Sequence, residues 1–219
     1  YDKDKYIVSK YIPYTSNGKN IEDFRNKIDF RKSAYKNFDI NMFYPPWNKL
    51  YKTSYLTKNN IQFPVTYRDD FPFVISVIKD IENVTYTKTS YYNFVRLRSD
   101  SETQKYVSNL YEKREEEHEY MIELYKHWEM LDDDNSIEMI ARRYIDRLIE
   151  CMVNLYNTKC ELDEDEKKDK INLYMHTNNF DFCIKHARPR KFYLKLMYVP
   201  LKLRNATLCS LMSKFIYYI

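Results

Sequence analysis

Glycine is almost missing from this chain, since Gly18 is the only one among 219 residues. An average composition of about 7% glycine would supply roughly fifteen in a chain of this length. Because glycine lets a backbone turn with positive φ and approach a phosphate closely, its scarcity excludes a P-loop, a dinucleotide fingerprint, a nucleophile elbow and a kinase glycine-rich loop. Most familiar nucleotide-handling enzymes are therefore excluded.

Long apolar runs and a regular cysteine pattern are also lacking. The run from Phe71 to Ile78 is eight residues, and the closing stretch from Leu208 to Ile219 is interrupted by Lys214. A bilayer-spanning helix needs about 20 apolar residues, so we expect no membrane span. The four cysteines have irregular spacing, which favours reduced thiols in an intracellular compartment over a disulfide framework. The first residue is Tyr1 rather than Met, which fits a removed targeting segment and a truncated start equally well.

Aromatic residues, in contrast, are abundant. They make up 17% of the chain, with 23 Tyr and 12 Phe, and 44% of all residues are hydrophobic. This is far too much burial capacity for an intrinsically disordered chain, despite a mean hydropathy of -0.72. We therefore expect a folded chain of about one domain, with extended arms.

Charge divides the chain into three blocks. Residues 1 to 98 hold 17 basic and 10 acidic side chains, residues 99 to 170 hold 11 and 21, and residues 171 to 219 hold 8 and 1. The net charge of +4 hides this alternation. The two basic flanks suit a polyanion or an acidic protein partner, whereas the acidic middle suits neither.

The first part of the chain, residues 1–60, reads as a basic extended arm with one short helix over 21–30, N-capped by Asn20. Two prolines before Trp47 hold the backbone extended and present a large ring, so we predict that Tyr44, Trp47 and Trp128 anchor a partner. Packing of Trp47 onto the protein's own helices is the alternative. Residues 61–98 carry β-branched runs with prolines, which predicts short strands or irregular structure.

The clearest periodicity lies in the acidic block, residues 99–180. Apolar residues recur at spacings of three and four from about Glu102 to Leu131 and again from about Ile137 to Asn157. The break between them supplies N-cap residues for the second helix. A short break between two long helices predicts an antiparallel helical hairpin. The charged run 161–170 is expected to be a solvated loop or the first turn of a third helix.

The last block, residues 181–219, is basic and aromatic. We expect an extended strip followed by a terminal helix from Ala206. Pro189 keeps the strip extended, its cations offer contacts to phosphates, and its rings offer stacking faces for unpaired bases. A solvated surface, or an interface with the acidic hairpin of the same chain, is the alternative. The predicted RNA-binding residues are Arg188, Arg190, Lys191, Phe192, Tyr193, Lys195, Lys202 and Arg204.

Catalytic and metal-binding patterns are weak. Glu115 to Glu119, with His118 among them, are consecutive on a helix and so point around its circumference, which favours an exposed charged face over a metal cradle. A zinc site could be drawn from Cys151, Cys160, Cys183 and His186, but structural zinc normally shows tighter pairs. We therefore predict no catalytic site, no metal, no cofactor and no small-molecule substrate.

One stretch resembles a known family. It contains Tyr92, then Leu97-Arg98-Ser99-Asp100-Ser101, then Leu110-Tyr111-Glu112-Lys113-Arg114, a break, and a second helix from Ile137. With these residues the chain resembles the mitochondrial form of the helical-hairpin protein near the exit tunnel of the large ribosomal subunit. The resemblance covers about residues 92 to 157. It implies rRNA binding, contact with neighbouring ribosomal proteins and no catalysis.

The sequence thus predicts a mainly α protein: a long antiparallel helical hairpin with extended, irregular N- and C-terminal arms and short strands. Its expected function is that of a structural constituent of a mitochondrial ribosome, in the matrix, which binds rRNA and neighbouring proteins. The alternative is a non-catalytic accessory subunit of a mitochondrial respiratory or ATP synthase complex, held by protein–protein interaction.

Overall fold

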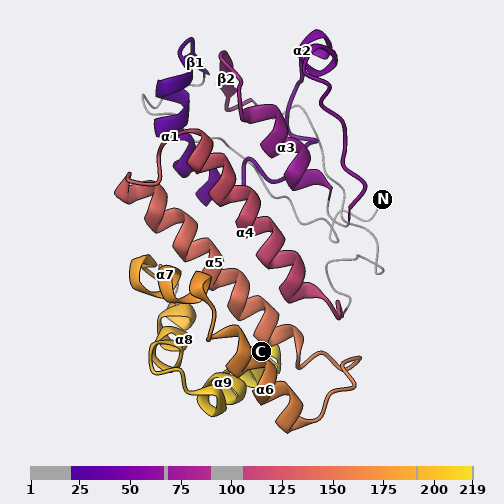
Figure 1. Ribbon diagram of the computed structural model, residues 1–219, viewed down its shortest axis with the longest axis vertical. Coiled ribbons are helices and arrows are strands. Elements are labelled where there is room, and N and C mark those ends of the chain that lie inside the picture. Colours follow the sequence, from indigo (N-terminus) through magenta and orange to yellow (C-terminus); the bar gives the residue numbers. More distant parts are fainter. Residues whose placement is uncertain (1–20, 67–68, 90–105, 191, 219) are drawn as a thin grey trace. The chain divides into compact units, whose positions relative to one another are not determined.

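The computed structural model describes residues 21–66, 69–89, 106–190 and 192–218, and these residues are mainly helical with one two-stranded sheet (Figure 1). The predicted mainly α fold class is confirmed. The chain divides into two compact units. The first comprises residues 1–101 and 123–130, and the second comprises residues 102–122 and 131–219. Each unit is described by itself.

The sheet of the first unit pairs strand β1 (Ile21–Phe24) with strand β2 (Val84–Thr87) in antiparallel register. One face places the ring of Phe24 5.2 Å from that of Tyr86, and both rings are buried. On the other face the Thr85 hydroxyl donates to the Asp23 carboxylate at 2.6 Å. Strand β2 is therefore one short strand within the segment 61–98, where short strands or irregular structure were predicted.

The helix predicted over 21–30 is wrong in its first half. Residues Ile21–Phe24 form β1, and helix α1 runs over Lys27–Asp39, capped by the Asn26 side chain, which accepts from the Ile28 amide. The predicted cap, Asn20, lies outside the described residues. A short helix, α2, follows at Thr53–Lys58. The arm 1–60 is thus helical in part, and its first 20 residues lie outside the described ranges.

The run Phe71 to Ile78 is also helical, against the expectation of strand or irregular structure. Helix α3 covers Asp70–Ile78, and seven of its nine residues are buried. Periodicity cannot distinguish a helix from a strand when nearly every side chain in a short run is buried. Pro72 lies in the first turn, where a missing amide hydrogen breaks no helical hydrogen bond.

The core of the first unit is built from aromatic rings in edge-to-face contact. Phe30 lies 5.9 Å from Phe43 and 5.9 Å from Trp128, and Tyr125 lies 5.2 Å from Trp128, all between ring centroids. The Trp128 indole donates to the Lys79 carbonyl at 2.8 Å. Such pairs add about 0.5–1.5 kcal/mol each beyond their buried area. Abundant aromatics therefore supply the packing of this unit.

The second unit contains the predicted antiparallel hairpin. Helix α4 runs over Leu110–His127, its residues up to Ile122 belonging to this unit, and helix α5 runs over Asp134–Asn154. The side-chain amide of Asn154 donates to the backbone carbonyl of Val107 and accepts from the backbone N–H of Val107. These two bonds tie the residues just before α4 to the end of α5. Further along, Arg114 pairs with Glu150. The opposed order of these contacts makes the helices antiparallel.

Four helices follow the hairpin: α6 (Glu164–Tyr174), α7 (Asn178–His186), α8 (Phe192–Lys202) and α9 (Ala206–Tyr218). Helices α7 and α9 pack against α5, while α6 and α8 pack against α9 (Figure 1). The terminal helix was predicted, but the extended C-terminal arm was not correct. Its apolar residues Leu194, Met197, Tyr198 and Leu201 join the core of the hairpin instead.

Helix ends in this chain show how it manages without glycine. Asn41, Asn60, Glu129 and Arg204 have φ between 49° and 57°, and each lies two residues beyond the end of α1, α2, α4 or α8. In every case the next amide bonds back to a carbonyl five residues earlier, as in Met130 to Tyr125 at 3.0 Å. This is the Schellman motif, whose left-handed position glycine usually occupies.

The left-handed position of α4 gives a first prediction. Glu129→Gly should raise the free energy of unfolding by up to about 1 kcal/mol, because a residue with a Cβ is strained in this conformation. Glu119→Gly, at an exposed position inside the same helix, should lower it by about 1 kcal/mol. Urea denaturation of both variants measures the difference. Destabilisation of similar size in both would contradict the strain at Glu129.

Candidate RNA-binding surface

The predicted RNA-binding residues lie on a short connection and on the helix that follows it. Helix α7 ends at His186, and Ala187 is extended at ψ 136° with its methyl group buried. Residues 188–190 carry two arginines around Pro189 before α8 begins at Phe192. Residues 187–190 are thus a non-helical connection of about four residues, of which Ala187 has an extended backbone.

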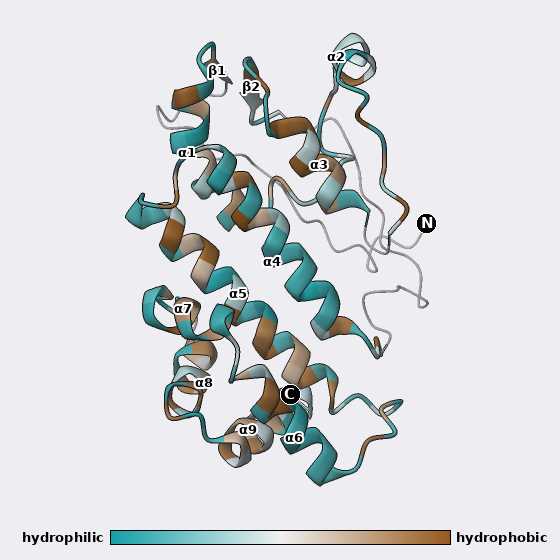
Figure 2. Ribbon diagram, viewed as in Figure 1, coloured by the Kyte–Doolittle hydropathy of each residue, from teal (hydrophilic) through white to brown (hydrophobic). Residues whose placement is uncertain are grey.

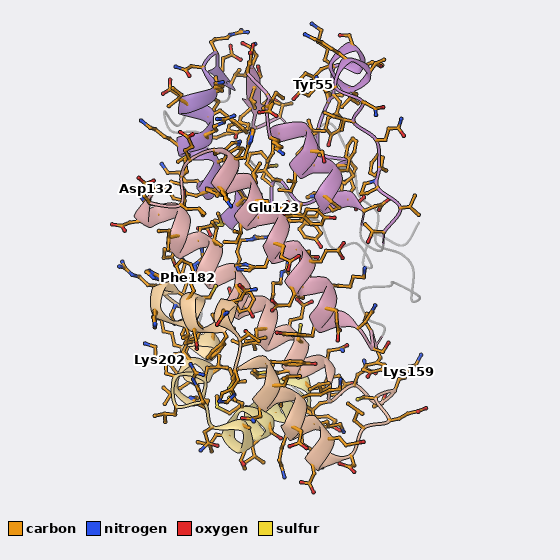
Figure 3. All side chains as sticks on the ribbon, viewed as in Figure 1. Tyr55, Glu123, Asp132, Lys159, Phe182 and Lys202 are labelled. Carbon is orange, nitrogen blue, oxygen red and sulfur yellow. The ribbon has the colours of Figure 1, made fainter. Side chains whose placement is uncertain are left out.

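Three predicted cations are exposed and have no ion-pair partner among the described residues: Arg188, Lys195 and Lys202. Lys195 and Lys202 are seven residues apart on α8, so they project from the same flank of the helix. Figure 3 shows Lys202 pointing outward from the second unit. Between residues 182 and 219 the sequence holds no carboxylate side chain. This stretch of sequence therefore contributes only positive side-chain charge to the flank.

Two other predicted cations bind carboxylates of the same unit. Arg190 lies 3.4 Å from Glu138 of α5, and Arg204 pairs with Asp181 of α7 while its guanidinium lies over the ring of Phe180 at 5.5 Å. Both arginines are solvent-accessible. Exposed ion pairs of this kind contribute about 0–1 kcal/mol, so a phosphate group could compete for either guanidinium.

The aromatic members of the predicted set differ in what the structure describes. Phe192 is 76% exposed at the start of α8. Lys191 and the side chain of Tyr193 lie outside the described residues. Of the two predicted stacking rings, Phe192 is therefore the one that the structure shows exposed to solvent beside these cations.

The predicted partner anchors lie in the first unit. Tyr44 stacks on Phe71 with ring centroids 5.2 Å apart, and Trp47 is half-buried. Trp128 is only 4% exposed, and its indole hydrogen is already donated to Lys79. We assign Trp128 to the core, because a buried ring with a satisfied hydrogen bond has no surface left for a partner.

Glu115 was expected on an exposed charged face, but it connects three elements of the second unit. One carboxylate oxygen accepts from the Tyr144 hydroxyl of α5 at 2.6 Å, and the other accepts from the Asn179 amide of α7 at 2.8 Å. Burial, together with this carboxylate, raises the pKa of Tyr111 to about 12. Charge density along the sequence did not reveal that one of these glutamates is a structural acceptor.

A second polar network clamps the hairpin. Arg114 is 5% exposed and forms paired bonds to Glu117 at 2.6–2.7 Å and to Glu150 at 2.9–3.0 Å. Burial disfavours the ionised form of Glu150, but the guanidiniums of Arg114 and Arg147 outweigh it and lower the pKa of this carboxyl. Such bidentate bonds fix geometry as well as charge. The network sets the register of α4 on α5.

His118 lies next to a cysteine without forming a nucleophilic pair. Its Nε2 is 4.0 Å from the Cys183 sulfur, and its ring lies 4.6 Å from that of Tyr144. Burial lowers the pKa of His118 to about 4, although Glu115 acts in the opposite direction. Burial also raises the pKa of Cys183. Both groups are therefore neutral near pH 7, which is not the thiolate–imidazolium state of a reactive pair.

The residues considered for zinc are not brought together. Cys151 and Cys183 are buried, Cys160 is half-buried, and all four cysteines are free. His186 lies on the exposed side of α7. Within the ranges that the structure describes, no group of three or more His, Cys, Asp or Glu side chains is placed to hold a metal ion.

Comparison with models of protein families, with curated proteins and with solved structures gave no significant match. Among the described helices, none has both the length and the apolar character needed to cross a bilayer.

The buried imidazole gives a second prediction. A histidine whose pKa falls from 6.5 in the unfolded chain to about 4 in the folded one stabilises the fold fully above pH 6.5 and progressively less as the pH falls to 4. A shift of this size corresponds to roughly 3 kcal/mol. His118→Gln should therefore flatten the pH dependence of the unfolding free energy in this window.

The control for this measurement is His176→Gln, because His176 is exposed on the loop after α6. Denaturant unfolding at several pH values between 6.5 and 4 compares the three proteins. An unchanged slope in His118→Gln would show that carboxylates alone set the acid sensitivity.

Proposed function

We propose that this chain is a structural, non-catalytic constituent of a mitochondrial ribosome that binds rRNA through the basic flank of its C-terminal helices. The observation that carries the proposal is the segregation of charge. Arg188, Lys195 and Lys202 are exposed and, among the described residues, have no ion-pair partner, whereas three hairpin carboxylates are already bound within the chain: Glu117 and Glu150 by Arg114, and Glu115 by Tyr144. A phosphate backbone binds to cations and avoids carboxylates.

The antiparallel hairpin supports the same proposal. Helices α4 and α5 are the arrangement that the resemblance to the helical-hairpin ribosomal protein implies. The residues before the hairpin that carry part of this resemblance, 92–101, lie outside the described ranges. The second half, from Leu110 through the second helix, lies within them.

The proposed RNA contacts follow helix α8. Lys195 and Lys202 follow one flank of α8 and can each neutralise one phosphate, and Arg188 extends the series beyond the start of the helix. Phe192, between Arg188 and Lys195 in the sequence, can stack on an unpaired base. Single-stranded or looped RNA fits such a set better than a regular duplex, because its bases are accessible to a ring.

A substitution series tests this surface. The triple change Arg188→Ala, Lys195→Ala and Lys202→Ala should weaken binding of rRNA fragments and reduce the slope of log K against log salt by about 0.7–0.9 for each lost phosphate contact. Filter binding or fluorescence anisotropy at several salt concentrations provides both quantities. Phe192→Ala should weaken binding by about 1–3 kcal/mol with the slope unchanged.

The matched control removes three lysines outside this flank: Lys126→Ala, Lys159→Ala and Lys170→Ala. These residues have no ion pair within the described part of the chain, so the control loses the same net charge. Equal weakening in both triple variants would mean that the net charge of the chain, rather than this flank, binds RNA.

A second candidate function is a non-catalytic accessory subunit of a mitochondrial respiratory or ATP synthase complex. The exposed apolar side chains of α8 and α9 favour it, because an interface between proteins requires such side chains. We expect the native particle to become smaller when ribonuclease is added to an extract in which the chain is tagged. Size-exclusion chromatography measures this change, and a particle that resists ribonuclease and contains a membrane complex would support the second candidate instead.

A further inference from the structure

The last two helices turn large apolar side chains toward solvent. The outer face of α8 and α9 consists of eight residues that are 44–76% exposed: Phe192, Leu196 and Val199 along α8, Leu203 directly after its end, and Leu208, Leu211, Phe215 and Tyr218 along α9. Their spacings of three and four place each set on one side of its helix. Figure 2 shows apolar residues recurring along both helices.

Helix α9 buries its small residues more completely than its large ones. Its buried residues are Cys209, Ser210 and Ser213, Met212 and Tyr217 are partly buried against the core, and Leu208, Leu211, Phe215 and Tyr218 point outward. Ser210 bonds to the Tyr156 hydroxyl inside the unit. A helix stabilised by its own core alone would bury its leucines and expose its serines. The outer face is therefore built for contact with something outside the chain.

The size of this face exceeds that of an ordinary surface patch. If a large apolar side chain exposes about 150–200 Å² when bare, eight that are about 60% exposed present roughly 900 Å² on these helices, against about 300–600 Å² for the largest apolar patch of a typical monomer. Helices α8 and α9 pack against each other and cover one core, so their outer sides both point away from it.

Three possible occupants fit this face poorly. RNA would cover this aliphatic face poorly, because its surface is mostly charged phosphate and sugar, and an unpaired base offers a flat apolar face only to a ring such as that of Phe192. A second copy would bring the same cations, Lys195 and Lys202, against each other. A protein partner normally supplies about one hydrogen bond for each 100–200 Å² of interface, yet seven of the eight outer-face side chains carry no polar group.

We infer that the outer face of α8 and α9 binds the surface of a lipid bilayer rich in anionic phospholipids. The acyl region accepts aliphatic and aromatic side chains without asking for hydrogen bonds, and Lys195 and Lys202 lie beside the apolar side chains of α8, where their long stems can extend to lipid phosphates. Between residues 182 and 219 the sequence holds no carboxylate side chain, and Lys214 of α9 pairs with Glu164 of α6, so the side chains of α8 and α9 themselves add no negative charge beside the anionic headgroups.

This inference goes beyond the proposed function and does not depend on it, since lipid binding is measured on the purified chain without RNA. Lys195 and Lys202 could contact phosphates of either RNA or lipid, so the aliphatic side chains distinguish the two. Substitution of the aliphatic side chains of the outer face should weaken vesicle binding and leave RNA binding unchanged.

Flotation with lipid vesicles tests the inference. The full chain should float with vesicles that mix phosphatidylcholine and phosphatidylserine, and much less with phosphatidylcholine alone. Leu196→Gln with Leu211→Gln should lower the partition coefficient by roughly tenfold or more for each side chain. Lys195→Gln with Lys202→Gln should lower it about fivefold for each lysine on the mixed vesicles, with little effect on neutral ones.

The matched control is Leu50→Gln with Leu173→Gln, two leucines that are 100% and 63% exposed outside the outer face. It should bind vesicles like the unchanged chain. A Phe215→Trp variant reports on position, because its added fluorescence should shift to shorter wavelength with mixed vesicles. Three results would each overturn the inference: the unchanged chain does not float, the control pair loses as much binding as the outer-face pair, or the fluorescence of the added tryptophan does not shift. Either of the first two results would leave a protein partner as the occupant.

Discussion

The second unit depends on covering helix α5. Eleven of its 21 residues are buried, and they extend around more of the helix than one neighbour can cover. Helix α4 contacts α5 where Arg114 pairs with Glu150, and α7 and α9 also pack against α5. Because uncovered leucine and isoleucine side chains on α5 would each cost about 1.5–3 kcal/mol, the C-terminal residues fold back on the hairpin rather than extend into solvent.

This constraint explains which predictions from sequence were correct. The hairpin has strong helical periodicity in both helices and a polar break with N-cap residues between them, so its type and direction follow from local signals. The C-terminal segment has equally apolar residues, but Pro189 and Pro200 suggest extended structure when the segment is read alone. Pro200 is tolerated inside α8 because Leu194, Met197 and Leu201 are buried against the rest of the core. Tertiary burial, which a local pattern does not contain, decides the conformation here.

The same reasoning applies to the candidate surface. The cationic character of the stretch after His186 could be read from the sequence, since it depends on composition alone. Which cations remain available could not, because Arg190 and Arg204 are engaged by Glu138 and Asp181, residues that are 52 and 23 positions away. Trp128 shows the converse case. In the sequence, a tryptophan on the apolar side of a predicted helix is the residue type expected of an interface anchor. Only the contact of its indole with Lys79 identifies it as a core residue.

The scarcity of glycine has a structural consequence beyond the active-site motifs that it excludes. Four helices end in a left-handed residue that is not glycine, and two of these residues are Asn, whose side chain makes this conformation less costly. Glu129 and Arg204 have no such advantage, and Arg204 stands between α8 and α9. Its strain is offset by the ion pair with Asp181 and by the contact with the Phe180 ring, which also hold the helix junction against α7. Arg204 therefore follows the end of α8 and holds the junction between α8 and α9 against Asp181 and Phe180 of α7, so the same cation that could contact an external phosphate also stabilises this junction.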